Sequence, residues 1–253
     1  MTSCVDDDEF LFLACVSRWE VARARLLTSP CLQAGKRPLW LRWNASSAAE
    51  AFNDVMDASP PHRWVVWLHQ DVVLPEGWDT LFSQAIAQAE QRLGRLSIVG
   101  AYGVIGAGVQ ARHAGHVLDR GHVLRGPAEL PSLVDSLDEL LVAVRSDSGL
   151  RMDPALGWDF YATDLVLQAQ AAGQQAAAVD AFCEHWSDTP SQPPLPRATA
   201  QRIAHSGTAF EAKWESHLPV TTTCVAIQQR GDVRAMAQSL LGDGVDPLEK
   251  AAP

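Results

Sequence analysis

The chain has 253 residues, of which 47% are hydrophobic and 20% charged, so its composition is that of a globular protein and excludes a disordered or fibrous one. This length fits one large domain or two small ones, with a substantial core. The formal net charge of −10 argues against binding nucleic acid or an anionic membrane through a basic surface. It leaves room for a local basic pocket that holds a phosphorylated ligand.

The cysteines and the apolar runs indicate a cytoplasmic protein. The five cysteines are odd in number and widely spread, with no C-x-x-C pair, which is typical of free thiols in a reducing compartment. Residues 1–9 are rich in acidic side chains and carry no basic segment, so we expect no signal peptide. The longest apolar runs, such as 10–16, are too short to cross a bilayer. We therefore expect that the chain is not an integral membrane protein.

The first hundred residues alternate apolar runs with helical segments. The run 10–16 is continuously apolar, as in a strand that is buried on both faces. The resulting βαβαβαβ order predicts an α/β fold with a mostly parallel, doubly wound sheet. The predicted strands are 10–16, 38–44, 64–69 and 96–100, and the predicted helices between them are 18–28, 46–57 and 78–93.

The pattern changes after residue 103. The segment 103–125 is rich in Gly, His and Val, and we expect loops and a short hairpin there. A helix over 160–172 is closed by Gly173 in a position that favours a left-handed residue. The remaining predictions are strands at 137–145 and 176–182 (the second being the last strand), a Pro-rich loop at 189–196, a helix at 198–217 and a surface helix after Arg230.

Polar groups follow the predicted strands. In open α/β sheets, ligands bind beyond the carboxyl ends of the strands, so these groups are the candidates for a functional site. They are Ser17-Arg18, Asn44 to Ser47, His69-Gln70-Asp71, Gly100 to Gly103 and His185 to Ser187.

The sharpest of these groups is His69-Gln70-Asp71. Residues i and i+2 of an extended segment point the same way, so His69 and Asp71 can face one ion together. An imidazole and a carboxylate suit Mn2+ or a similar divalent ion whose shell is completed by substrate phosphates. The alternative is a histidine at a strand end and an aspartate in a turn that form only local hydrogen bonds.

Other candidate groups give weaker signals. His113, His116 and His122 form an H-x-x-H cluster that we interpret as exposed histidines on a flexible hairpin. Asp159 and Asp164 flank the start of the 160–172 helix, where a carboxylate caps the helix or acts as a general base. The sequence has no G-x-S-x-G, no G-x-G-x-x-G between a strand and a helix, and no phosphate loop with Gly and Lys. The common hydrolase, Rossmann and P-loop classes are therefore excluded.

Several short motifs follow one another along about residues 10–224. They are Asn44-Ala-Ser-Ser-Ala-Ala-Glu-Ala-Phe-Asn53, Leu68-His-Gln-Asp-Val72, Val134-Asp-Ser-Leu-Asp-Glu139, Tyr161-Ala-Thr-Asp-Leu-Val-Leu-Gln-Ala169 with Gly173, Glu184-His-Trp-Ser187, Lys213-Trp214 and Leu218-Pro-Val-Thr-Thr222. In this order they resemble the glycosyltransferase-like family associated with streptomycin-type biosynthetic clusters, a branch close to the family-2 glycosyltransferases.

The resemblance implies the glycosyltransferase A fold, with one domain over 1–230 and a C-terminal helix and tail over 231–253. Residues 10–104 would form the nucleotide-binding half and residues 105–230 the acceptor-binding half. The substrate would be a nucleotide-diphosphate sugar, and the acceptor a glycan, lipid, natural product or protein. The candidates for binding the nucleotide sugar are Ser17, Arg18, Asn44, Ser46, Asn53, Gln70 and Asp138.

The resemblance also implies a metal and a base. Asp71, with His69 and His185 as further ligands, would bind Mn2+ or Mg2+ that bridges the donor diphosphate. Asp164, or failing that Asp159, would deprotonate the acceptor, and transfer would invert the anomeric centre. The chain departs from the family pattern in two places. His69 replaces the first carboxylate of the usual Asp-x-Asp, and Tyr161-Ala162 replace the Glu-Asp pair that often precedes the helix.

Two alternatives remain open from the sequence. One is a glycosyltransferase-fold module without transferase activity that binds a sugar nucleotide or a partner, for which the missing Glu-Asp pair is the reason. The other is a metal-dependent hydrolase that uses His69, Asp71, His113, His116 and His185.

Overall fold

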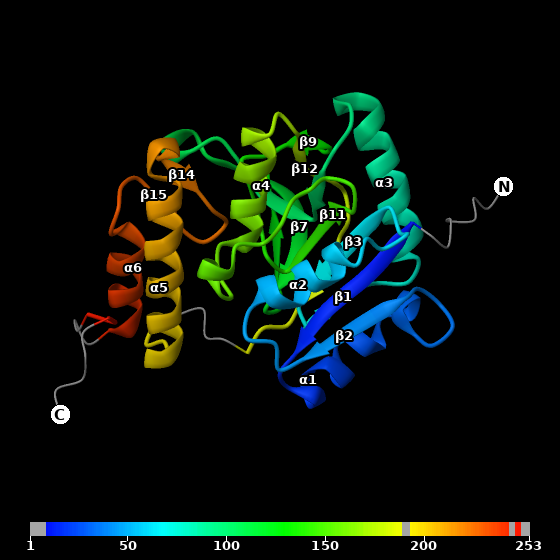
Figure 1. Cartoon of the computed structure of the whole chain (residues 1–253), viewed down its shortest axis with the longest axis horizontal. Coiled ribbons are helices and arrows are strands. Elements are labelled where there is room, and N and C mark those ends of the chain that lie inside the picture. Colours follow the sequence, from blue (N-terminus) through cyan, green and yellow to red (C-terminus); the bar gives the residue numbers. More distant parts are fainter. Residues whose placement is uncertain (1–8, 189–192, 243–245, 249–253) are drawn as a thin grey trace.

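A seven-stranded sheet forms the centre of the molecule, in a computed structural model that describes residues 9–188, 193–242 and 246–248 (Figure 1). The strand order is β2-β1-β3-β11-β5-β12-β9. All run in one direction except β11 and β9, which are antiparallel to their neighbours. The strands are β1 (Phe10–Val16), β2 (Leu39–Trp43), β3 (Trp64–Leu68), β5 (Ile98–Gly100), β9 (Ser132–Leu133), β11 (Leu141–Arg145) and β12 (Ala176–Ala178).

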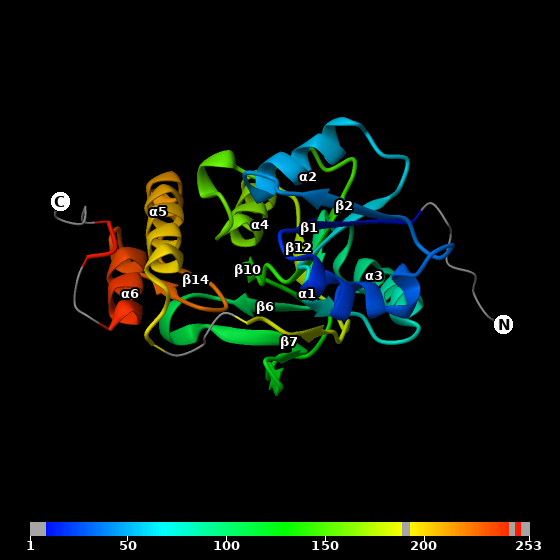
Figure 2. The same ribbon diagram turned by 90° about the horizontal axis from the view of Figure 1, so that it is seen from below.

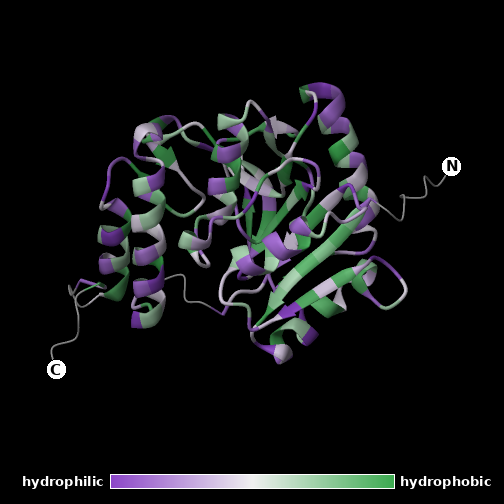
Figure 3. Cartoon of the chain, viewed as in Figure 1, coloured by the Kyte–Doolittle hydropathy of each residue, from purple (hydrophilic) through white to green (hydrophobic). Residues whose placement is uncertain are grey.

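Helices cover both faces of this sheet. Phe10 and Phe12 point to the face that packs against α3 (Trp78–Leu93), while Leu11 and Leu13 point to the opposite face. That second face packs against α2 (Ala48–Asp57) and α4 (Tyr161–Ala171). Burial on both sides explains why β1 is apolar at every position, and Figure 3 shows the hydrophobic residues gathered on the central strands. A short helix, α1 (Trp19–Ala24), follows β1.

A second sheet lies beside the first and carries much of the site. Its order is β10-β6-β7-β13-β4, and β8 pairs with β7 outside this path. In Figure 2, β6 and β7 run together below the main sheet in that view, while α2 lies above it. The strands are β4 (Val72–Val73), β6 (Tyr102–Ile105), β7 (Arg112–Asp119), β8 (His122–Arg125), β10 (Ser136–Leu137) and β13 (Glu184–His185).

The C-terminal part adds a pair of helices at one end of the molecule (Figure 1). These are α5 (Arg197–Lys213) and α6 (Asp232–Leu241), and the hairpin of β14 (Val220–Thr221) and β15 (Ala226–Ile227) joins their apolar cluster. Phe210 of α5 stacks near Phe160, at the start of α4, with ring centroids 5.2 Å apart. Single 3-10 turns lie at Leu26–Thr28, Pro30–Leu32, Gly108–Gln110, Pro154–Leu156 and Glu215–His217.

The predicted α/β fold with a mostly parallel central sheet flanked by helices is confirmed. The strand at 10–16 and the helix at 78–93 have the predicted bounds. The predicted nucleotide-binding half (10–104) and acceptor-binding half (105–230) do not form separate sheets, because β11 and β12 of the second half pair with β3 and β5 of the first. The assignment of a different ligand to each half stays a prediction.

One prediction for the second half of the chain is confirmed in part, and another is wrong. The short hairpin expected within 103–125 is present as β7 and β8, but the rest of the segment also forms strand, as most of β6 and the first part of β7, where loops were expected. Residues 176–182 do not contain the last strand, since β13, β14 and β15 follow. Part of the predicted Pro-rich loop, residues 189–192, lies outside the described residues.

The histidines of β7 are also less exposed than expected. His113 stacks on Tyr102 with ring centroids 5.3 Å apart, and His116 stacks on Phe182 at 5.1 Å. Both are half-buried, and among the three histidines of this segment only His122 is fully exposed. No helix in the part of the chain that the structure describes is long and apolar enough to cross a membrane.

The backbone of β7 at Gly115 lies very close to that of Ala101, the residue before β6, and this close packing yields a first prediction. Gly115 has a φ of +98°, and a Cβ there would lie 2.0 Å from the carbonyl oxygen of Ala101. Gly121, in the turn after β7, has a φ of +81° and no atom within 4 Å of such a Cβ. We expect Gly121→Ala to cost about 1–2 kcal/mol of unfolding free energy from backbone strain alone. Gly115→Ala should cost about 1–3 kcal/mol more, because the backbone must also move. Equal losses in urea unfolding would contradict the tight packing.

Candidate metal centre

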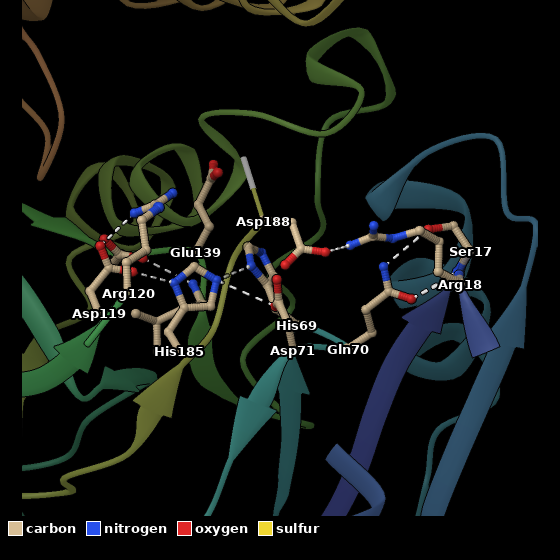
Figure 4. A network of polar contacts seen from close by, with 12 residues as sticks. Ser17, Arg18, His69, Gln70, Asp71, Asp119, Arg120, Glu139, His185 and Asp188 are labelled. Carbon is tan, nitrogen blue, oxygen red and sulfur yellow. Dashed lines mark hydrogen bonds and ion pairs between the residues drawn. The ribbon is translucent and has the colours of Figure 1, made fainter. Parts of the chain in front are cut away.

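The pairing of β13 places three side chains from distant parts of the chain beside one another. β13 lies between β4 and β7, with His185 opposite Val72 on one side and Asp119 on the other. The N–H of Trp186 donates to the carbonyl of Asp71 at 3.0 Å, and the N–H of Arg120 donates to the carbonyl of His185 at 2.9 Å. Asp71, His185 and Asp119 are thereby held in a row (Figure 4).

His69 completes a group of three side chains that can hold a metal ion. His69 follows the end of β3. Its backbone N–H donates to the carbonyl of Leu140, the residue before the adjacent strand β11, at 3.1 Å. One ligand atom from each of His69, Asp71 and His185 lies within 4.8 Å of the others. Nε2 of His185 lies 3.5 Å from Nδ1 of His69 and 3.3 Å from Oδ1 of Asp71. Two ligands bound to one ion at about 2.1 Å each lie about 3.0–3.4 Å apart, so these separations fit a shared ion.

The outward-facing nitrogen of each imidazole is held by a further group. Nε2 of His69 lies 2.8 Å from the hydroxyl of Tyr161, which also accepts a hydrogen bond from Nε1 of Trp67 at 3.0 Å. Nδ1 of His185 lies 2.8 Å from Oδ1 of Asp119. Metal-binding histidines are commonly oriented in this way, because the outer bond fixes the ring and leaves the inner nitrogen for the ion.

The donor atoms fit a divalent transition ion. Oδ1 of Asp71 is buried, and its contact with a described side chain is the ion pair with Nε2 of His185 at 3.3 Å, which is longer than an ordinary hydrogen bond. An ion between the three side chains would satisfy that oxygen. Two imidazoles and one carboxylate suit Mn2+ and similar ions better than Mg2+, which prefers oxygen ligands.

The two imidazoles differ in their affinity for protons. Burial and the positive charge of His185 lower the pKa of His69 to about 4. Burial also lowers the pKa of His185, but its contacts with the carboxylates of Asp119 and Asp71 outweigh that effect and raise the pKa to about 9. At neutral pH His185 therefore carries a positive charge between two carboxylates, and His69 is neutral.

Gln70 connects this centre to the end of β1. Its Oε1 accepts the backbone N–H groups of Ser17 and Arg18 at 3.1 and 3.0 Å, and its Nε2 donates to the Ser17 hydroxyl at 3.0 Å. The guanidinium of Arg18 forms an exposed ion pair with Asp188 at 2.8 Å (Figure 4). Three of the predicted nucleotide-sugar residues thus form one contact network next to the candidate ligands.

A cluster of carboxyl groups lies near the start of α4. Asp159 accepts from Arg202 at 3.1 Å and from the Ser206 hydroxyl at 3.1 Å, and burial raises its pKa in spite of Arg202. Burial and the charges of Asp159 and Asp138 raise the pKa of Glu139 well above its ordinary value. Asp138, predicted to bind the nucleotide sugar, instead accepts from the N–H of Leu140 at 3.0 Å and from the Thr223 hydroxyl at 2.7 Å.

The predicted base Asp164 occupies an unsuitable position. Its side chain is fully buried, and both oxygens are taken by protein groups. Oδ1 lies 2.7 Å from Nε1 of Trp214 and 2.7 Å from Nζ of Lys213, and Oδ2 accepts from Gln168 at 2.6 Å. No oxygen is left to meet an acceptor hydroxyl, so the sequence motif marks a structural carboxylate that ties α4 to α5.

Two of the predicted nucleotide-sugar residues stabilise local structure. Both polar atoms of the Asn53 side chain bond to the backbone of Met152, each at 2.9 Å, so this residue joins α2 to the segment before α4. The Ser46 hydroxyl and N–H bond to the carboxylate of Glu50, which is a helix-capping arrangement. Asn44, in contrast, is exposed at the end of β2 with a φ of +50°.

Sequence reasoning missed three residues of this centre. Asp119 ends β7 before a tight turn, Tyr161 was noted only as a replacement for Glu, and Glu139 entered only as the last residue of a motif. The histidines of the hydrolase alternative, His113 and His116, do not belong to the three-residue group, because they stack elsewhere on β7.

Comparisons with known proteins add the following findings. No family model matches the chain. It is 30% identical over 134 residues to "ATP synthase subunits region ORF 6" of Fuscovulum blasticum, a match over 49% of this chain and 51% of that protein, so the chain spans about half the length of this curated relative.

Three solved structures are similar to the chain. GalNAc-T7 with UDP, GalNAc and Mn2+ has a TM-score of 0.47 and 9% identity over 84% of this chain and 51% of that one. Protein A197 from STIV has a TM-score of 0.46 and 13% identity over 71% of this chain and 86% of that one. S. aureus TarS 1-349 in complex with UDP-GlcNAc has a TM-score of 0.46 and 8% identity over 94% of this chain and 72% of that one. At TM-scores below 0.5, these similarities carry no argument about activity.

The contact between Asp119 and His185 yields a prediction about metal binding. Asp119→Asn keeps the shape of the side chain but removes the charge that orients the imidazole and increases its basicity. We expect Mn2+ affinity to fall about 10- to 100-fold, measured by calorimetry. Asp54→Asn, on the exposed surface of α2, is the matched control and should bind Mn2+ like the wild type. Unchanged affinity in Asp119→Asn would contradict the supporting role of Asp119.

The burial of Asp164 yields a prediction about stability. Asp164→Asn should lower the free energy of unfolding by about 1–3 kcal/mol, because Lys213 loses its charged partner and a buried amide must replace a carboxylate. Mn2+ affinity should stay within the error of the wild-type value. A variant as stable as the wild type in urea would contradict the structural role of Asp164.

Proposed function

We propose that the chain is a metal-assisted glycosyltransferase that moves a sugar from a nucleotide-diphosphate sugar to an acceptor hydroxyl, with inversion at the anomeric carbon. The observation that carries the proposal is the group of His69, Asp71 and His185 at the carboxyl end of β3, in a mostly parallel sheet. Ligands of open α/β sheets bind at this edge. The ordered motifs that resemble family-2-like glycosyltransferases support the same reading.

The metal centre accounts for phosphate binding by an acidic protein. A bound Mn2+ would neutralise negative charge on the leaving diphosphate. The carboxylate of Asp71 then contributes to diphosphate binding through the ion, so the net charge of −10 needs no basic surface to offset it. Tyr161 and Asp119 hold the two imidazoles in the orientation that this requires.

The ends of β1 and β2 provide groups for the nucleoside. Trp19 and Trp43 lie with ring centroids 5.5 Å apart and are 43% and 52% exposed, so a base can stack on them. Asn44 lies exposed at the end of β2. The guanidinium of Arg18 forms an exposed ion pair with Asp188, which contributes little and can be exchanged for a phosphate.

A second candidate function is a binding module without turnover. It is favoured by Ala162, which offers no carboxylate at the start of α4, and by the full burial of Asp164. Such a module would bind a nucleotide sugar without releasing the nucleoside diphosphate. In both cases we place the protein in the cytoplasm, where the thiols Cys15, Cys31, Cys183 and Cys224 stay reduced.

Calorimetry tests the proposal directly. Wild-type protein is titrated with UDP-glucose, UDP-N-acetylglucosamine, GDP-mannose and dTDP-glucose, with Mn2+, with Mg2+ and without metal. We expect one nucleotide class to bind with Mn2+, more weakly with Mg2+, and at least about tenfold more weakly in Asp71→Asn, since the ion links protein and diphosphate.

His113→Asn is the matched control, because this imidazole lies on β7 outside the three-residue group. It should bind the same nucleotide sugar with wild-type affinity. The proposal is overturned if folded wild-type protein binds none of the donors, or if Asp71→Asn binds them as well as the wild type does.

A further inference from the structure

The proposed transferase needs a base, and the start of α4 offers none on its own helix. Position 162 is alanine and has no carboxylate. The Tyr161 hydroxyl forms a hydrogen bond with His69, and the Asp164 side chain is buried between α4 and α5. Two other carboxyl groups reach the same place from outside the helix. Glu139 comes from the segment before β11, and Asp159 from the turn before α4.

Glu139 is attached to the metal centre by backbone contacts. Its carbonyl oxygen lies 3.3 Å from the hydroxyl of Tyr161, which contacts His69. The next carbonyl, that of Leu140, accepts the backbone N–H of His69 at 3.1 Å. In Figure 4 the Glu139 side chain extends upward in the view, away from the strand ends that carry Asp71 and His185. The residue is thus fixed next to the candidate ligands without being one of them.

The carboxyl of Glu139 has an oxygen that the protein leaves unused. Oε1 is buried and forms no hydrogen bond with any residue that the structure describes. The backbone N–H of Tyr161 lowers the pKa of the carboxyl and so opposes the effect of burial, and it belongs to the start of α4, whose N-cap residue Phe160 provides no side-chain bond. A cap accounts for one oxygen only. A buried, unpaired carboxylate oxygen costs stability, so its retention calls for a functional explanation.

The surroundings also suit proton transfer. The negative charges of Asp159 and Asp138 and the burial of the side chain make Glu139 hold a proton more readily than an ordinary glutamate, while Arg202 opposes them. A general base works best when its proton affinity approaches the working pH. Asp159 is less suited, because Arg202 and Ser206 already occupy its two oxygens.

We propose that Glu139 is the catalytic base of the transferase and takes the proton of the acceptor hydroxyl on its free Oε1. As that proton leaves, the acceptor oxygen forms a bond to the anomeric carbon of the donor. The bond from this carbon to the diphosphate oxygen breaks, and its electron pair leaves with the nucleoside diphosphate. The proposal rests on the transferase function and assigns a residue that the helix motif does not contain.

The variant Glu139→Gln separates this role from capping, because an amide oxygen still accepts the Tyr161 N–H but cannot take a proton. The probe is the nucleotide sugar that binds in the calorimetric screen, with Mn2+ and with water as acceptor, and the rate of nucleoside diphosphate release is measured. We expect release to fall at least about 100-fold while Mn2+ and donor affinities stay within about threefold of wild type. Glu76→Gln, on the exposed surface, is the control and should release nucleoside diphosphate at the wild-type rate.

Thermal unfolding of the metal-free proteins provides a second measurement. The folded state holds the Glu139 proton more tightly than the unfolded state does, so wild-type stability falls as pH rises above about 4.5, the ordinary value for the group. Glu139→Gln lacks this loss. Its melting temperature relative to wild type should therefore increase from pH 5 to pH 8.

Each outcome has a defined meaning. Release by Glu139→Gln at the wild-type rate, or a melting-temperature difference that shrinks from pH 5 to pH 8, overturns the role of Glu139. Donor binding by wild type without any release of nucleoside diphosphate supports the binding module and also overturns the base. Absence of donor binding by folded wild type removes the proposed function itself, whereas a loss confined to Glu139→Gln leaves that function standing and supports the base.

Discussion

The candidate site depends on the register of β13, a strand of only two residues. Its pairing with β4 on one side and β7 on the other places His185 between Asp71 and Asp119. A shift by one residue would turn His185 to the other face and bring Glu184 into its place. The backbone bonds from Arg120 to His185 and from Trp186 to Asp71 hold this register. The metal centre is therefore a property of the second sheet as much as of the strand end that carries His69.

The position between Asp71 and Asp119 favours a positive charge. Asp71 and Asp119 contact His185 from both sides, and Arg120 contacts Asp119 at 2.5 Å. In the metal-free protein the imidazolium of His185 supplies the charge between the two carboxylates. A divalent ion would supply it instead, and the inner nitrogen of His185 would become a ligand. With or without an ion, the carboxylates of Asp71 and Asp119 would then keep a positively charged neighbour.

The local parts of the site were predictable from the sequence, and the long-range parts were not. His69 and Asp71 are two residues apart in an extended segment, so their common direction follows from strand geometry alone. Asp119 and Glu139 reach the centre through strand pairs whose partners are separated by many residues. The full burial of Asp164 could not be predicted, because a motif gives a residue's position along the helix but not its burial. The strands β1 and β3 were easy to predict because burial on both faces leaves a continuous apolar run.

The position of β11 has a consequence for how the chain folds during synthesis. Of the parallel strands of the main sheet, β5 is the next after β3 in the sequence. In the sheet, however, β11 lies between them and pairs with both. When a ribosome has released only the first hundred residues, the edges of β3 and β5 have no partner and the sheet has a gap in its middle. An unpaired edge of apolar residues is prone to associate with other chains. The sheet is completed only after Leu141–Arg145 has emerged, so the chain must wait for that segment before its most apolar strands are protected.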